Sequence, residues 1–167
     1  MKSIDGLLDE MNREAKTTRR VLEAIPGDKL AWKPHERSWS LGDLGSHIAT
    51  IPGVVAQEAL VEAFDLSRVT RQSFASRTEI LTAFEESMAH AREILAPQDD
   101  DWMMSTWTLV VAGKPVLRIP RGRFLRAVLL NHSYHHRGQL TVYLRLLDVP
   151  VPAIYGPSAD EGPFSRR

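Results

Sequence analysis

Two histidines, His132 and His136, stand four residues apart in a segment whose apolar residues recur at helical spacing. At about 100° per residue, their side chains lie about 40° apart on one face of a helix predicted over residues 122–147. Leu125 and Leu129 share this face, so both imidazoles point into the protein, where a neutral ring needs a partner. Two imidazoles at this spacing can bind one metal ion, as in helical zinc motifs. The alternative is a pair of hydrogen-bonded core histidines.

A metal site needs at least one more protein ligand. The chain has no cysteine among its 167 residues, so the ligand must be a histidine or a carboxylate. His47 is the best candidate, because it lies beside the apolar stripe of another predicted helix, whereas His35 falls in a loop and His90 on a polar helix face. We therefore predict a site made of His47, His132 and His136. Three ligands leave a position open for water or substrate, as in catalytic zinc sites.

Other polar residues are candidates for supporting roles. His135 is offset by about 60° from His132, and we assign it a place next to the ligands or in helix packing. Gln139 and Tyr143 lie on or near the histidine face, and Gln139 could hydrogen-bond a ligand histidine. Tyr155 is expected to pack the C-terminal tail, with a position close to a substrate as the alternative.

Four further residues are less well placed to take part in the site. Tyr134 and Arg137 face away from the histidine stripe and are predicted to be surface or dimer contacts. Asp43 and Glu58 are the carboxylates that could approach the site as a fourth ligand if Pro52 kinks their helix.

The elements that must position these residues are mainly helical. Apolar periodicity predicts four helices, at residues 3–24, from 41 onward, 78–95 and 122–147. Ser40 and Thr78 are the predicted caps of the second and third helices. Pro52 should kink or interrupt the second helix, which then resumes as far as residue 64, and residues 65–77 form a loop.

Two segments interrupt this helical pattern. Residues 107–111 and 116–119 are β-prone around a turn at residues 112–115, which predicts a short hairpin or flap between the third and fourth helices. The proline-rich tail at residues 149–157 is expected to pack across the helices. The predicted fold is an all-α four-helix bundle with this flap, formed as a single domain over residues 1–167.

The amino-acid composition limits the kinds of molecule that we expect this protein to bind. Lysine plus arginine equals aspartate plus glutamate, at 21 each, so no basic footprint for nucleic acid is evident. Zero net charge also fits a protein that associates with itself. No apolar run approaches the ~20 residues that span a bilayer, and no signal-peptide core is present. We expect a cytoplasmic protein that acts on a small molecule and contacts neither membrane nor nucleic acid.

Three stretches carry a family resemblance. The segment from Trp39 to His47, the segment from Asn131 to Arg145 and the tail from Pro150 to Glu161 resemble the DinB family. This is the damage-inducible, metal-binding group, which is unrelated to the translesion polymerase of the same gene name. The likeness extends over essentially the whole chain, and the histidine-rich segment is its most specific part.

The resemblance implies a four-helix bundle, often homodimeric, that holds a divalent metal through one histidine of the second helix and two of the fourth. Those positions correspond to His47, His132 and His136. Zinc or nickel is the usual ion. Relatives include S-transferases and maleylpyruvate isomerase, which use a low-molecular-weight thiol.

The function predicted on this basis is that of a divalent-metal-dependent enzyme of the thiol-transferase or hydrolase type, working on a small molecule at an open site. One alternative is a metal- or ligand-binding protein of the stress response without catalysis. A second alternative is a dimer in which the metal has only a structural role and holds helices together. A structural zinc, however, normally has four protein ligands.

Overall fold

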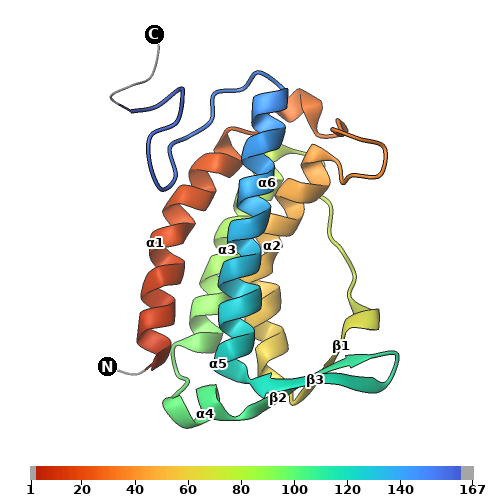
Figure 1. Cartoon of the computed structure of the whole chain (residues 1–167), viewed down its shortest axis with the longest axis vertical. Helices are drawn as coiled ribbons and strands as arrows, with labels where there is room; N and C mark the ends of the chain where they lie inside the picture. The colour runs from red at the N-terminus through yellow and green to blue at the C-terminus, as the bar shows by residue number, and fades with distance from the viewer. Residues whose placement is uncertain (1–2, 163–167) are drawn as a thin grey trace.

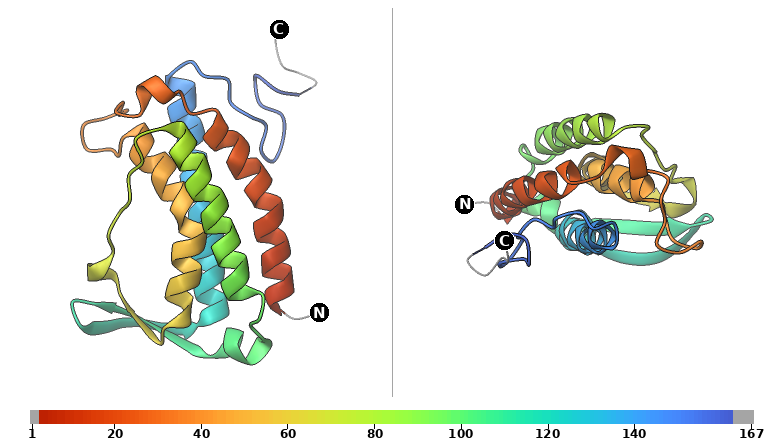
Figure 2. Two further views of the ribbon diagram at one scale, coloured as in Figure 1. Left: turned by 180° about the vertical axis from the view of Figure 1, so that it is seen from behind. Right: turned by 90° about the horizontal axis from the view of Figure 1, so that it is seen from above.

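Four long helical segments dominate the computed structural model, which describes residues 3–162 (Figure 1). They are α1 (Ser3–Glu23), α2 (Leu41–Leu60), α3 (Arg77–Leu95) and a run made of α5 (Arg121–Phe124), a π-helical segment (Leu125–Asn131) and α6 (His132–Leu146). The segments lie side by side in both views of Figure 2 and bury one apolar core between them. The predicted, mainly helical fold is confirmed.

Pro52 does not break α2, which continues through it to Leu60 rather than resuming toward residue 64. Proline removes one backbone donor and crowds the preceding turn. A side chain of α3 bonds the backbone at this point, because Ser87 Oγ accepts from Gly53 N at 2.7 Å and donates to the Thr50 carbonyl at 3.2 Å. Of the predicted kink or interruption, the interruption is therefore wrong, because α2 is helical on both sides of Pro52.

The helix caps agree with the sequence in one case and differ in the other. Ser40 caps α2, as predicted, and accepts from the backbone N–H of Asp43 at 3.1 Å. The cap of α3 is Ser76 instead of Thr78, and it accepts from the N–H of Glu79. Glu79 in turn accepts from the N–H of Ala75. The two reciprocal bonds resemble a capping box, which favours a start two residues earlier.

A small sheet covers one end of the helices. Its strands are β1 (Ala63–Asp65), β2 (Thr106–Val111) and β3 (Lys114–Pro120), in the order β1-β2-β3. The predicted hairpin is confirmed as β2 and β3, which pair antiparallel. Strand β1 pairs parallel to β2. Its three residues follow α2, at the point where we expected helix and then loop, and the short helix α4 (Asp100–Met104) precedes β2.

Buried polar contacts join this sheet to the end of α2. Trp107 of β2 donates its indole N–H to the Glu58 carbonyl at 3.0 Å. Arg121 is buried and donates to the carbonyls of Ala59 at 2.9 Å and Val61 at 3.3 Å. These bonds satisfy carbonyls at the C-terminal end of α2, which have no partner within the helix.

Arg137 is not the surface or dimer contact that its helical position indicated. Its side chain is only 1% exposed, because α1 and the C-terminal segment cover it. It pairs with Glu14 at 2.6 Å, donates to Thr18 at 3.1 Å and donates to the Tyr155 hydroxyl at 2.5 Å. Tyr134 is half-buried on the same seam and donates to Glu10 at 2.8 Å.

Across residues 3–162, no helix is long and apolar enough to cross a membrane.

Candidate metal centre

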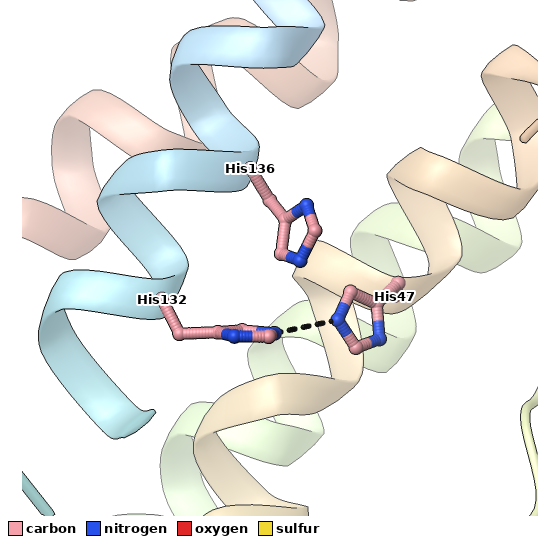
Figure 3. A group of neighbouring side chains, drawn as sticks. All are labelled: His47, His132 and His136. Carbon is pink, nitrogen blue, oxygen red and sulfur yellow. Dashed lines mark hydrogen bonds between the residues drawn. The ribbon is translucent and has the colours of Figure 1, made fainter. Parts of the chain in front are cut away.

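Three histidines from two helices point toward one another in Figure 3: His47 of α2 and His132 and His136 of α6. The Nε2 atoms of His47 and His132 are 2.9 Å apart. One ring nitrogen of each histidine lies within 4.8 Å of the others, and no other group of histidine, aspartate and glutamate in the described part of the chain meets this criterion. The structure therefore brings together the three residues on which the sequence analysis centred.

Local structure explains this convergence. The four-residue spacing in α6 stacks His132 and His136 one turn apart. The Ser40 cap begins α2, so His47 lies two turns into that helix and faces α6. The π-helical segment ends directly before His132, in the middle of a helix predicted to be regular. Such segments are frequent at functional sites.

Gln139 determines which nitrogen of His136 carries the proton. Its Oε1 lies 2.7 Å from His136 Nδ1. An amide oxygen only accepts hydrogen bonds, so Nδ1 must donate and Nε2 keeps its lone pair. Partners of this kind hold a ligand histidine in the tautomer that metal binding requires.

The electrostatic environment keeps all three rings neutral. Burial, followed by the neighbouring His136 and His132 and by Arg71, lowers the pKa of His47 to about 4. Burial, followed by His136 and His135, lowers the pKa of His132 to about 4. Burial also lowers the pKa of His136, an effect that the bond to Gln139 partly offsets. Neutral imidazole is the form that binds metals.

Two residues at the centre were missed by the sequence analysis. The Trp39 ring packs edge-on against His47 at 4.9 Å between centroids and stacks on His136 at 5.5 Å. The guanidinium of Arg71 lies 4.4 Å from the centroid of the Trp39 ring. Trp39 could have been noticed from its position just before the Ser40 cap. Arg71 lies in an aperiodic polar segment that carries no such signal.

The other predicted neighbours of the site take different positions. His135 is exposed, with its ring centroid 5.0 Å from that of His136. Tyr143 packs edge-on against Trp32 and donates to the Trp39 carbonyl at 3.4 Å. Tyr155 is not among the residues lining the cavity beside the histidines, and its hydroxyl donates to Glu14 at 2.8 Å.

Neither carboxylate considered as a fourth ligand joins the three histidines. Asp43 accepts from the hydroxyls of Ser40 and Ser73, each at 2.6 Å, and these bonds hold its pKa below the usual value. Glu58 lies on α2 eleven residues after His47, about 16 Å along the helix. Both line the cavity without reaching the imidazoles.

The histidines form part of the wall of a half-open cavity of about 1190 Å³. One side is α2, and the opposite side is the segment of residues 61–73, which stands away from the helices in Figure 1. Val110 and Gly113 of the β2–β3 hairpin contribute to the lining. Sites for small molecules commonly have volumes of about 300–1,000 Å³, so a small-molecule ligand fits beside the histidines.

The donor set fits a divalent transition ion. Imidazole nitrogens suit zinc, nickel and copper, whereas magnesium and calcium prefer oxygen. Zinc–nitrogen bonds of about 2.0–2.1 Å put two ligands of a tetrahedral ion about 3.3 Å apart. The 2.9 Å between the Nε2 atoms of His47 and His132 is close to that separation, so a small adjustment of the rings is sufficient.

Comparisons with known proteins show a family and a shared fold. The model of the DinB family matches residues 1–163. The uncharacterized protein YrdA of Bacillus subtilis strain 168 is 24% identical over 164 residues, which cover 96% of this chain and 92% of YrdA. A solved DinB-like protein from Bacillus cereus ATCC 10987 has a TM-score of 0.72 at 22% identity, covering 90% of this chain and 97% of that one. The DinB-like protein YjoA from Bacillus subtilis has a TM-score of 0.70 at 18% identity, with the same two coverages. At these identities the solved structures show a shared fold.

Proposed function

The chain belongs to the DinB family, and from that premise we propose that it is an enzyme that binds one divalent transition ion, zinc or nickel, and transforms a small molecule. The ligands are His47, His132 and His136, held between the helices of a four-helix bundle. The observation that carries the proposal is the convergence of three imidazoles, kept neutral by their surroundings, at the wall of a large cavity.

The number of ligands supports catalysis over a structural role. Three histidines leave at least one position of a tetrahedral ion for a ligand from the cavity. When bound, the ion supplies a Lewis acid that lowers the pKa of a water or thiol ligand. The chain's own residues keep the imidazoles neutral, orient His136 through Gln139 and enclose the reacting molecule.

The reaction class follows from the same features. Thiol transfer needs a sulfur nucleophile, and a chain without cysteine must take it from a low-molecular-weight thiol cosubstrate. Hydrolysis needs only water at the open position. Both reactions suit an open three-histidine site, and we propose one of the two as the activity.

We also propose that the protein works as a homodimer in the cytoplasm. Val142 and Leu146, four residues apart on α6, are large apolar side chains with 56% and 58% exposure, and they support an association between two copies. Sedimentation equilibrium of the wild type beside Val142→Asp tests the dimer. We expect twice the monomer mass for the wild type, and a monomeric wild type would exclude this part of the proposal.

Metal analysis tests the site. Wild-type protein is expected to hold about one zinc or nickel per chain, whereas His47→Ala and His132→Ala should lose most of it, because two imidazoles bind an ion far more weakly than three. His90→Ala is the matched control, since His90 is exposed on α3. Stoichiometric metal in the His47→Ala and His132→Ala proteins would exclude these residues as ligands.

Turnover tests the activity. Metal-loaded wild type is assayed with a chlorinated aromatic or epoxide electrophile and several low-molecular-weight thiols, and separately with esters. We expect turnover that His132→Ala abolishes and His90→Ala retains. Metal binding without turnover in any of these assays would instead favour the non-catalytic binding protein.

A further inference from the structure

Arg71 is a cation in the lining of the cavity. Within residues 3–162, none of the ion pairs includes it. Its guanidinium lies against the Trp39 ring, and Trp39 packs on both His47 and His136. A single indole ring therefore separates this charge from the metal centre.

Two carboxylates of the lining, Asp43 and Asp65, accept hydrogen bonds from groups other than Arg71. Asp43 accepts from two serine hydroxyls, and Asp65 accepts from Ser67 and from the backbone N–H of Gly113. Stacking on an aromatic ring uses the face of a guanidinium and leaves the N–H groups at its edge able to donate. Arg71 thus offers donors to a molecule in the cavity.

The wall beyond Arg71 is apolar. Val54, Val61, Leu66 and Val69 all line the cavity, yet each is between 40% and 51% exposed. They come from both sides of the cavity, from α2 and from the segment of residues 61–73. Large apolar side chains that stay exposed in a concave site mark a surface that a ligand covers.

The far part of the cavity is unfavourable for a second anion. Glu58 lines it, three turns of α2 beyond His47. A ligand with negative charge at both ends would bring one of them toward this carboxylate. The cavity therefore differs in charge between its two ends.

We propose that the cavity binds an elongated apolar molecule that carries one carboxylate, with the carboxylate on Arg71 and the apolar chain along α2 toward Glu58. The planar fork of arginine matches a carboxylate in bidentate geometry. This inference rests on the proposed function and deepens it, because it names the class of small molecule that would be presented to the three histidines.

Calorimetric titration with octanoate tests the proposal, using zinc-free and zinc-loaded protein. We expect one saturable site in both forms, because Arg71 and the apolar wall do not depend on the ion. Arg71→Met should weaken binding about tenfold or more, the loss of a hydrogen bond to a charged group. Arg13→Met is the matched control and should bind as the wild type does, since Arg13 is exposed on α1 and does not line the cavity.

Three probes separate the contributions to affinity. Octan-1-ol lacks the charge, butanoate lacks most of the apolar chain, and octanedioate adds an anion at the far end, so all three should bind more weakly than octanoate. Val54→Asp should abolish octanoate binding and leave zinc uptake intact.

The outcomes distinguish this inference from the proposed function. If zinc-loaded wild type fails to bind octanoate, or if Arg71→Met binds it as tightly as the wild type, the inference is overturned and the metal centre stands. If the protein takes up no zinc but binds octanoate in an Arg71-dependent way, the ligand class is supported and the metal centre is overturned.

Discussion

At the scale of single residues, the centre depends on neutral imidazoles whose ring nitrogens converge, with Nε2 of His47 and Nε2 of His132 hydrogen-bonded to each other at 2.9 Å (Figure 3). Burial lowers the pKa of His47 and His132 to about 4, so both rings are uncharged at neutral pH and each keeps one ring N–H. Gln139 adds direction by holding the Nδ1 proton of His136 and leaving Nε2 available. The hydrogen bond that His136 donates to Gln139, a residue outside the ligand set, thus leaves the Nε2 atom of His136 able to bind a metal ion.

Replacing Gln139 with leucine tests this arrangement. We expect zinc affinity to fall about 10–100-fold, because the ring of His136 loses the partner that selects its tautomer. Competition with a zinc chelator measures the dissociation constant. Gln57→Leu is the matched control, since Gln57 is an exposed glutamine on α2 that contacts His90. Equal affinities for the two variants would rule out the proposed role of Gln139.

At the scale of elements, α2 stays helical through Pro52 and is hydrogen-bonded there by its neighbour α3. Pro52 lies inside the helix, and the hydroxyl of Ser87 on α3 bonds both the N–H of Gly53 and the carbonyl of Thr50. The closeness of the two helices is part of this contact, because a Cβ on Gly53 would meet the Ser87 backbone at 3.2 Å. An unbroken α2 carries both His47 and the apolar wall of the cavity.

Ser87→Ala should lower the free energy of unfolding by about 1–3 kcal/mol, because the N–H of Gly53 and the carbonyl of Thr50 both lose the Ser87 hydroxyl as a partner. Urea denaturation followed by circular dichroism measures the change. Thr82→Ala removes an exposed hydroxyl from the same helix and should change stability by about 0.5 kcal/mol or less. A loss in Ser87→Ala no larger than in the control would show that Pro52 is accommodated in another way.

At the scale of the whole molecule, the C-terminal segment is fastened to α1 and α6 by a buried charge. Arg137 bonds Glu14 and Thr18 of α1 together with Tyr155 of the tail. A second contact, between Arg20 of α1 and Glu161, is exposed. Ion pairs of these two kinds differ in energy, because only the buried one leaves an unsolvated charge when it is broken.

Arg137→Ala should therefore destabilise the fold by about 3 kcal/mol, whereas Arg20→Ala should cost about 0–1 kcal/mol. Chemical denaturation of both variants beside the wild type provides the comparison. Zinc uptake by folded Arg137→Ala should stay near one per chain, because Arg137 faces α1 rather than the three histidines. A change in Arg137→Ala as small as that in Arg20→Ala would mean that the tail is held mainly by other contacts.

Local sequence determined the parts of this protein that depend on spacing. The four-residue interval between His132 and His136 puts both rings on one helix face wherever that helix packs. Ser40 begins α2 through a bond only three residues long. The absence of cysteine restricted the ligands to histidine and carboxylate before any geometry was known. The hairpin of β2 and β3 could also be predicted from the sequence, because its two strands and its turn are contiguous in the chain.

The tertiary structure determined the burial, strand pairing and side-chain contacts that involve residues far apart in the sequence. Arg137 has the helical position of a surface residue, and only the docking of α1 and the tail buries it. Strand β1 exists because β2, more than forty residues later, supplies its hydrogen bonds. Trp39 reaches the histidines and Arg71 reaches Trp39 through the path of two irregular segments, which no periodicity describes. The physical reason is the same throughout: spacing along one element sets the direction of a side chain, and packing between elements sets what that side chain meets.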